Sequence, residues 1–104
     1  MIRGPDVAAR LERALLASAA AAGCPVRLDI ASSERWASAT FAGARHMLTL
    51  AGEAGPAIEA WLAGLPEAEF ALRGHLVADL SVEAVRREEG GVTALVEVLT
   101  VEER

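Results

Sequence analysis

The sequence predicts an α+β fold in which two helices cover one face of a curved antiparallel sheet of about four strands. Three observations lead to this prediction. Apolar residues recur at helical spacing in two segments, and each segment begins at a Gly-Pro pair. Apolar and polar residues alternate along much of the remaining chain, as they do in half-buried strands. A Glu-Glu-Gly-Gly turn joins the last two strands, so the element order is α-β-β-α-β-β.

The chain is short and acidic. It has 104 residues, of which 53% are hydrophobic, and this predicts a single α+β domain over residues 1–104 with a packed core. The net charge of −5 argues against nucleic acid as a partner, because contacts to phosphates need a basic surface. No apolar run approaches the roughly 18 residues of a membrane span. The acidic residues Asp6 and Glu12 lie where a signal peptide carries positive charge, which argues against a signal peptide. We therefore expect a cytoplasmic protein that does not contact a membrane.

The first helix is predicted over residues 5–22. Pro5 is preorganised for a first helical turn, and Asp6 places a carboxylate near the positive end of the helix dipole. Gly23 provides a C-terminal stop. The predicted apolar face consists of Val7, Leu11, Ala14, Leu15, Ser18, Ala19 and Ala22.

The next segment is predicted to form two strands. Val26 to Ala31 alternates between apolar and polar residues, and the polar residues Ser32 to Arg35 then predict a turn. The second strand is expected from Trp36 to Leu50. Its apolar residues change parity midway, which predicts a bulge or bend, and Gly43 is the expected position.

The second helix is predicted over residues 56–64. A Gly-Pro pair again starts it, and Gly64 and Pro66 end it. Trp61 is expected to be its main anchor in the core, because a large aromatic ring buries more area than its aliphatic neighbours. The rest of the apolar stripe is Ile58, Leu62 and Leu65.

The third strand is predicted between Glu69 and Glu88. Its strict alternation places Phe70, Leu72, Leu76, Leu80 and Val82 toward the core. The other parity would face outward, and it contains Arg73, His75, Val77, Asp79 and Val85.

The last strand, Val92 to Val101, carries aliphatic residues on both faces. One set has even numbers and one has odd numbers, and the hairpin register decides which set faces the core. We favour the even set inside because the odd set includes Glu97. Either register leaves aliphatic side chains facing outward, and a contiguous apolar patch of this kind is typical of an interface. The predicted interface residues are Val77, Val85, Leu95, Leu99 and Val101.

A second candidate site is a set of basic residues on the sheet. Arg73 and His75 on one strand, with Arg45 and His46 on a neighbouring strand, could bind a small anionic ligand. No metal site is expected, since the chain has two His and one Cys, Cys24. No cofactor-binding motif is present and no catalytic residue can be nominated, so an enzyme is the less favoured class.

The composition limits the chemistry further. The chain lacks Lys, Asn, Gln and Tyr, which indicates a GC-rich bacterial genome and removes several catalytic groups. The sequence therefore predicts a small non-enzymatic interaction module that forms a homodimer through an apolar sheet face. The alternative is a binder of a small anionic molecule, or an enzyme, that uses the Arg/His face of the sheet.

Overall fold

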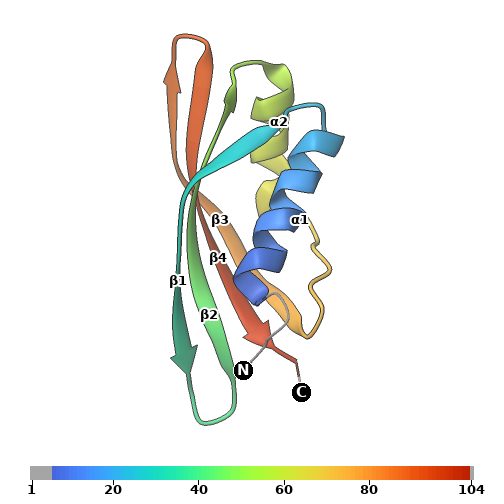
Figure 1. Cartoon of the computed structure of the whole chain (residues 1–104), viewed down its shortest axis with the longest axis vertical. Helices are drawn as coiled ribbons and strands as arrows, with labels where there is room; N and C mark the ends of the chain where they lie inside the picture. Colours follow the sequence, from blue (N-terminus) through green and yellow to red (C-terminus); the bar gives the residue numbers. More distant parts are fainter. Residues whose placement is uncertain (1–5, 104) are drawn as a thin grey trace.

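A computed structural model describes residues 6–103 of the chain (Figure 1). The expected helix start at Gly4-Pro5 lies outside these residues. Two α-helices, one 3-10 turn and four strands follow in the order α1 (Val7–Ala21), β1 (Val26–Ala37), β2 (Ala42–Glu53), α2 (Pro56–Gly64), η1 (Leu65–Glu67), β3 (His75–Glu88) and β4 (Gly91–Glu102).

The predicted α+β architecture is confirmed. The four strands form one open antiparallel sheet in the order β1-β2-β4-β3. Both helices lie on the same side of this sheet, and no element within residues 6–103 covers the other side (Figure 1). We call the side that faces the helices the inner face and the opposite side the outer face.

Helix α1 begins one residue after its cap. The Asp6 carboxylate accepts a hydrogen bond from the Ala9 backbone N–H at 3.0 Å, which satisfies a donor that the helix leaves free. Three residues at helical spacing, Leu11, Leu15 and Ala19, are fully buried against the sheet.

Helix α2 has the predicted bounds, and its tryptophan lies in the core. The Trp61 indole N–H donates to the Ser18 hydroxyl at 2.9 Å, so this bond ties α2 to α1. The core between the helices and the inner face is formed by Leu11, Leu15, Ala19, Cys24, Leu48, Leu50, Ile58, Trp61, Leu62, Leu65, Leu72, Leu80, Val92, Ala94, Val96 and Val98.

The predicted position of the first hairpin was wrong. Ser32 to Arg35 continues β1, and the turn falls at Ser38–Phe41. The Ser38 hydroxyl accepts hydrogen bonds from the backbone N–H groups of Phe41, at 3.0 Å, and Thr40, at 3.4 Å. The polar residues mistaken for a turn belong to an edge strand, where they are exposed.

The bulge predicted at Gly43 was also wrong, because β2 pairs with β4 in one continuous register from Gly43 to Glu53. Close approach explains this glycine instead. A Cβ atom at position 43 would lie 1.9 Å from the Thr100 carbonyl oxygen and 2.8 Å from the Trp36 ring.

Strand β3 starts at His75 rather than near Glu69, and its alternation is interrupted twice. The register against β4 shifts between Val77 and Asp79 and again between Val82 and Ala84. Each shift reverses which parity faces the core, so the predicted parity holds only between the two shifts. The predicted outward position of Val77 and Val85 was therefore wrong, because both pack against the core. Leu76, predicted to be inside, is 55% exposed and lies in register with Val101.

Strand β4 has the favoured orientation. The even-numbered residues Val92, Ala94, Val96 and Val98 are at most 3% exposed. The odd-numbered residues face outward and are half-buried.

Candidate functional site

The outer face carries an uncovered group of apolar side chains. Leu95, Leu99 and Val101 come from β4, as the sequence predicted. Three further members were not predicted. They are Ile30 at 68% exposed, Leu76 at 55% exposed and the half-buried Met47. We call these six residues the outer apolar patch.

An ion pair lies beside this patch. The Arg45 Nε atom is 2.8 Å from the Glu97 Oε2 atom, and both residues project from the two central strands onto the outer face. The pair leaves the two central strands without net charge on this face, whereas Glu34 on β1 and Asp79 on β3 each add an exposed carboxylate beside it. Charges already paired within one chain can be covered at a lower desolvation cost than isolated charges.

A hollow of about 240 Å³ opens on the same face beside Trp36. The Trp36 ring lies across Gly43, and its indole N–H is buried without a hydrogen-bond partner among residues 6–103. The hollow is lined by Glu34, Arg35, Trp36, Arg45 and Leu99.

The structure separates the four basic residues of the predicted anion site. Arg45 is exposed on the outer face, whereas His46 is buried on the inner face at 1% exposed. Arg73 lies in the loop before β3, and the Arg73 carbonyl oxygen accepts a hydrogen bond from the Arg10 guanidinium at 2.9 Å. The His75 Nδ1 atom lies 3.3 Å from that same oxygen. The side chains therefore do not form one anion-binding cluster.

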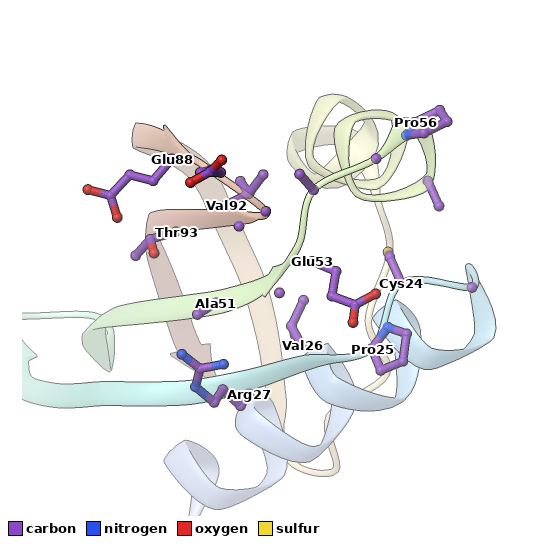
Figure 2. A pocket seen from close by; sticks show the side chains of 18 residues that line it. Cys24, Pro25, Val26, Arg27, Ala51, Glu53, Pro56, Glu88, Val92 and Thr93 are labelled. Carbon is purple, nitrogen blue, oxygen red and sulfur yellow. The ribbon is translucent and has the colours of Figure 1, made fainter.

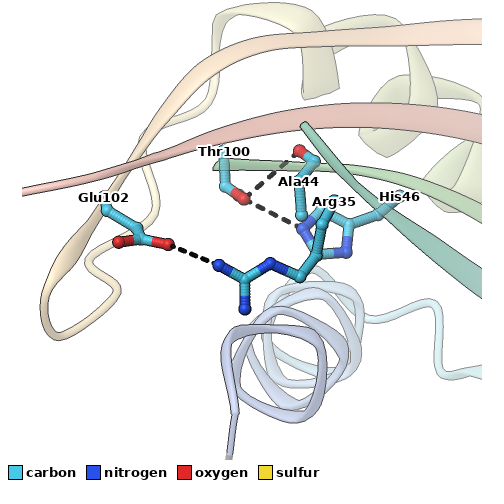
Figure 3. A network of polar contacts seen from close by, with 5 residues as sticks. All are labelled: Arg35, Ala44, His46, Thr100 and Glu102. Carbon is cyan, nitrogen blue, oxygen red and sulfur yellow. Dashed lines mark hydrogen bonds and ion pairs between the residues drawn. The ribbon is translucent and has the colours of Figure 1, made fainter. Parts of the chain in front are cut away.

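His46 is held by hydroxyl groups from the strands on both sides of β2. Its Nδ1 atom lies 2.8 Å from the Ser33 hydroxyl oxygen, and its Nε2 atom lies 3.0 Å from the Thr100 hydroxyl oxygen. Figure 3 shows the second of these contacts and the bond from Thr100 to the Ala44 carbonyl oxygen, 3.4 Å long.

The bond to Ala44 favours one tautomer of the ring. When Thr100 donates its single hydroxyl proton to Ala44, it accepts from Nε2–H and Ser33 donates to Nδ1. Burial lowers the pKa of His46, because the charged ring loses its hydration. The carboxylate of Asp6 opposes this shift and His75 adds to it. His46 is thus a neutral, fully bonded group.

A serine that donates to a histidine resembles the start of a nucleophilic triad. The third group here is Thr100, which is neutral and cannot stabilise an imidazolium as a carboxylate does. The geometry therefore favours a structural role for Ser33, His46 and Thr100, which tie β1, β2 and β4 together.

Figure 2 shows an open groove of about 810 Å³ at the end of the molecule where β1 and α2 begin and the β3–β4 hairpin turns. Its charged lining includes three carboxylates, Glu53, Glu88 and Glu89. The basic residue at its rim, Arg27, is paired with Asp29 at 3.1 Å. Burial raises the pKa of the Cys24 thiol, which lies beside the groove, so this thiol is a poor nucleophile.

Neither a metal site nor a membrane span can be assigned to residues 6–103. No three His, Cys, Asp or Glu residues in this range are close enough to hold an ion together. Neither helix in the range has the length and apolar character needed to cross a bilayer. Comparisons of the chain with models of protein families, with curated proteins and with solved structures find no match.

Proposed function

We propose that this protein is a small interaction module that self-associates in the cytoplasm, and that the outer sheet face is buried by a second copy of the chain. One observation carries the proposal. The central strand β4 has aliphatic side chains on both faces, yet helices cover only the inner face. A sheet with water on one side normally alternates apolar and polar residues more cleanly.

The size of the outer apolar patch is compatible with a dimer. Full burial of one aliphatic side chain contributes roughly 1.5–3 kcal/mol. Association costs about 4–15 kcal/mol in lost freedom of motion. Ile30 and Leu76 are exposed and gain most of this, whereas the four half-buried residues gain only part of it. Counted on two copies, the gross gain can still exceed the cost.

A second copy fits the charge of this surface. The exposed Arg45–Glu97 pair is neutral as a unit, so a partner with a strong charge of either sign gains little there. A two-fold contact between identical faces brings like surfaces together and needs no external charge complement. Binding of a small anion is less supported, because Arg45 and His46 point to opposite faces.

Light scattering coupled to size exclusion tests the proposal. We expect the wild type to elute at tens of micromolar as a dimer of its 10.9 kDa chain. A variant with Leu95→Glu and Leu99→Glu should stay folded but run as a monomer at this concentration, because four like charges would meet across the contact.

Ala17→Glu with Ala20→Glu provides the matched control. It adds the same two charges at exposed positions of α1, on the other side of the sheet, and it should still associate. A monomeric wild type would contradict the proposal. So would a Leu95→Glu, Leu99→Glu variant that is folded and still dimeric.

A further inference from the structure

The two edges of the sheet differ in regularity. The β3 edge is interrupted by two register shifts, which bend the strand and break its row of free backbone groups. The β1 edge has a single shift, between Leu28 and Ile30, and then runs in continuous register to Ala37. In that regular segment every residue except Trp36 is exposed.

The free backbone groups of β1 can be assigned. Ser38 N–H donates to the Phe41 carbonyl at 2.7 Å at the hairpin turn. Antiparallel pairs alternate between bonded and non-bonded positions, so Trp36, Glu34 and Ser32 bond toward β2. The backbone groups of Ala31, Ser33, Arg35 and Ala37 therefore point away from the sheet.

We infer that the β1 edges of two copies of this chain pair antiparallel about a two-fold axis at Ser33, and so join two sheets into one. β1 contains no proline, and its charged residues in the regular segment, Glu34 and Arg35, are of opposite sign. This contact is separate from the outer-face dimer of the proposed function. It involves only the edge of one short strand segment, so we expect it to be too weak to change the species present at tens of micromolar and to be captured by covalent cross-linking.

The regular segment fixes the axis. With the axis at Ser33, the segment 30–36 pairs with the same segment of the other copy, and Leu28 and Asp29, where the register shifts, stay outside the contact. Ile30, the most exposed large apolar residue within 6–103, then faces Trp36 of the other copy on the outer face. Aromatic and β-branched pairs of this kind stabilise antiparallel sheets.

Neighbouring axes are less favourable. An axis at Glu34 places two glutamates directly opposite each other, which is destabilising. An axis at Ser32 puts Ile30 opposite Glu34 and draws Asp29, at the irregularity, into the pairing. The axis at Ser33 places Ala31 opposite Arg35 and Ser32 opposite Glu34, with no like charges in register.

Disulfide cross-linking tests both the contact and the axis. Cys24, buried at 7% exposed, is first replaced by Ala, so the introduced thiol is unique. Ser33→Cys then places two Cα atoms about 5.5 Å apart across the axis, within disulfide range. For Ser32→Cys the two Cα atoms would be about 8 Å apart, which a disulfide does not span without movement of the backbone.

We expect mild oxidation to give at least about tenfold more covalent dimer for Ser33→Cys than for Ser32→Cys. Adding Ala31→Pro to Ser33→Cys should abolish the cross-link, because it removes an edge-directed N–H without touching the bonds to β2. A double variant, Ala31→Cys with Arg35→Cys, avoids any loss of the Ser33–His46 bond. It should also cross-link between copies, since its two sites lie about 13 Å apart within one strand.

The same measurement in the Leu95→Glu, Leu99→Glu background separates this inference from the outer-face dimer. Ser33→Cys should still cross-link there, even where the outer-face contact has been lost or never forms. Equal yields from Ser33→Cys and Ser32→Cys would overturn the inference, and so would a higher yield from Ser32→Cys. Absence of a cross-link from both Ser33→Cys and the double variant would do the same.

Discussion

The two faces of the sheet come from the same strands but differ in what covers them. In β4, Val96 and Val98 are fully buried, whereas Leu95 and Leu99, which alternate with them, are half-buried. Helices α1 and α2 cover the inner face, and no element within residues 6–103 covers the outer face (Figure 1). Strand β4 thus carries aliphatic side chains on both faces, while the described chain covers one of them.

The two tryptophans show the same contrast. Trp61 lies in the core and its N–H donates to Ser18. Trp36 lies on the outer face, and its buried N–H finds no acceptor among residues 6–103. A buried donor without a partner costs about 1–3 kcal/mol. The tryptophan N–H on the inner face therefore has a hydrogen-bond partner, and the tryptophan N–H on the outer face has none among residues 6–103.

The largest expected effect comes from placing charge on the inner face. A variant with Val96→Glu and Val98→Glu should not fold, because both side chains would be buried in the core without a counter-charge. Circular dichroism should show loss of the cooperative thermal transition.

The outward variant, Leu95→Glu with Leu99→Glu, is the matched control, with the same charges on alternate positions of the same strand. It should keep its transition. If both variants unfold, the two faces are equally needed by a single chain, and the contrast between them is wrong.

A smaller effect is expected at Gly43, where β2 passes beneath Trp36. Gly43→Ala should lower the free energy of unfolding by about 1–3 kcal/mol, because the new Cβ overlaps the Thr100 carbonyl and the Trp36 ring. Gly64→Ala is the control, since a Cβ there meets nothing within 4 Å and the backbone φ is negative. Chemical denaturation of both variants measures the difference. Equal stabilities of the two variants would show that Trp36 and the Thr100 backbone can move aside to accommodate a Cβ at position 43 without a loss of stability.

The tryptophans should respond differently to loss of the indole N–H. Trp61→Phe removes a satisfied hydrogen bond and leaves the Ser18 hydroxyl without its donor, whereas Trp36→Phe removes a donor that has no partner. We expect Trp61→Phe to be the more destabilising by at least about 1 kcal/mol. The comparison should be made by urea unfolding at a concentration where the chain is monomeric. A larger loss for Trp36→Phe would contradict it.

Much of the fold could be predicted because its signals are local. Asp6, Gly23 and the Gly-Pro pair before Ile58 mark helix ends by their own chemistry, and the even-numbered residues of β4 alternate over ten positions. The first hairpin was missed because the strand was assumed to alternate between apolar and polar residues, so the polar run Ser32 to Arg35 was interpreted as a turn. That run lies in an edge strand, where both faces can be exposed and polar.

The candidate site was predicted only in part, for a different reason. Leu95, Leu99 and Val101 were placed correctly because β4 has no irregularity. Val77 and Val85 were misplaced because two bulges in β3 reverse its parity, and no glycine or proline in the strand marks them. Ile30 reached the outer face through a similar shift in β1. Sequence alternation predicts a face only where the register is continuous.

The smallest expected effect is a pH dependence of the free energy of unfolding that His46 on the inner face contributes. His46 is the one histidine fully buried on the inner face, and burial lowers its pKa below the value of an unfolded histidine, near 6.5. As the pH falls below this value, the unfolded chain binds a proton that the folded chain does not, so the free energy of unfolding decreases. Above about pH 7 both states are neutral and the contribution is constant.

His46→Gln keeps a donor and an acceptor for Thr100 and Ser33 but cannot titrate. Urea unfolding between about pH 7.5 and 5.5 should therefore show a steeper loss of stability for the wild type than for His46→Gln. Parallel curves would mean that His46 is hydrated in the folded chain, and that the inner face is not closed where α1 begins.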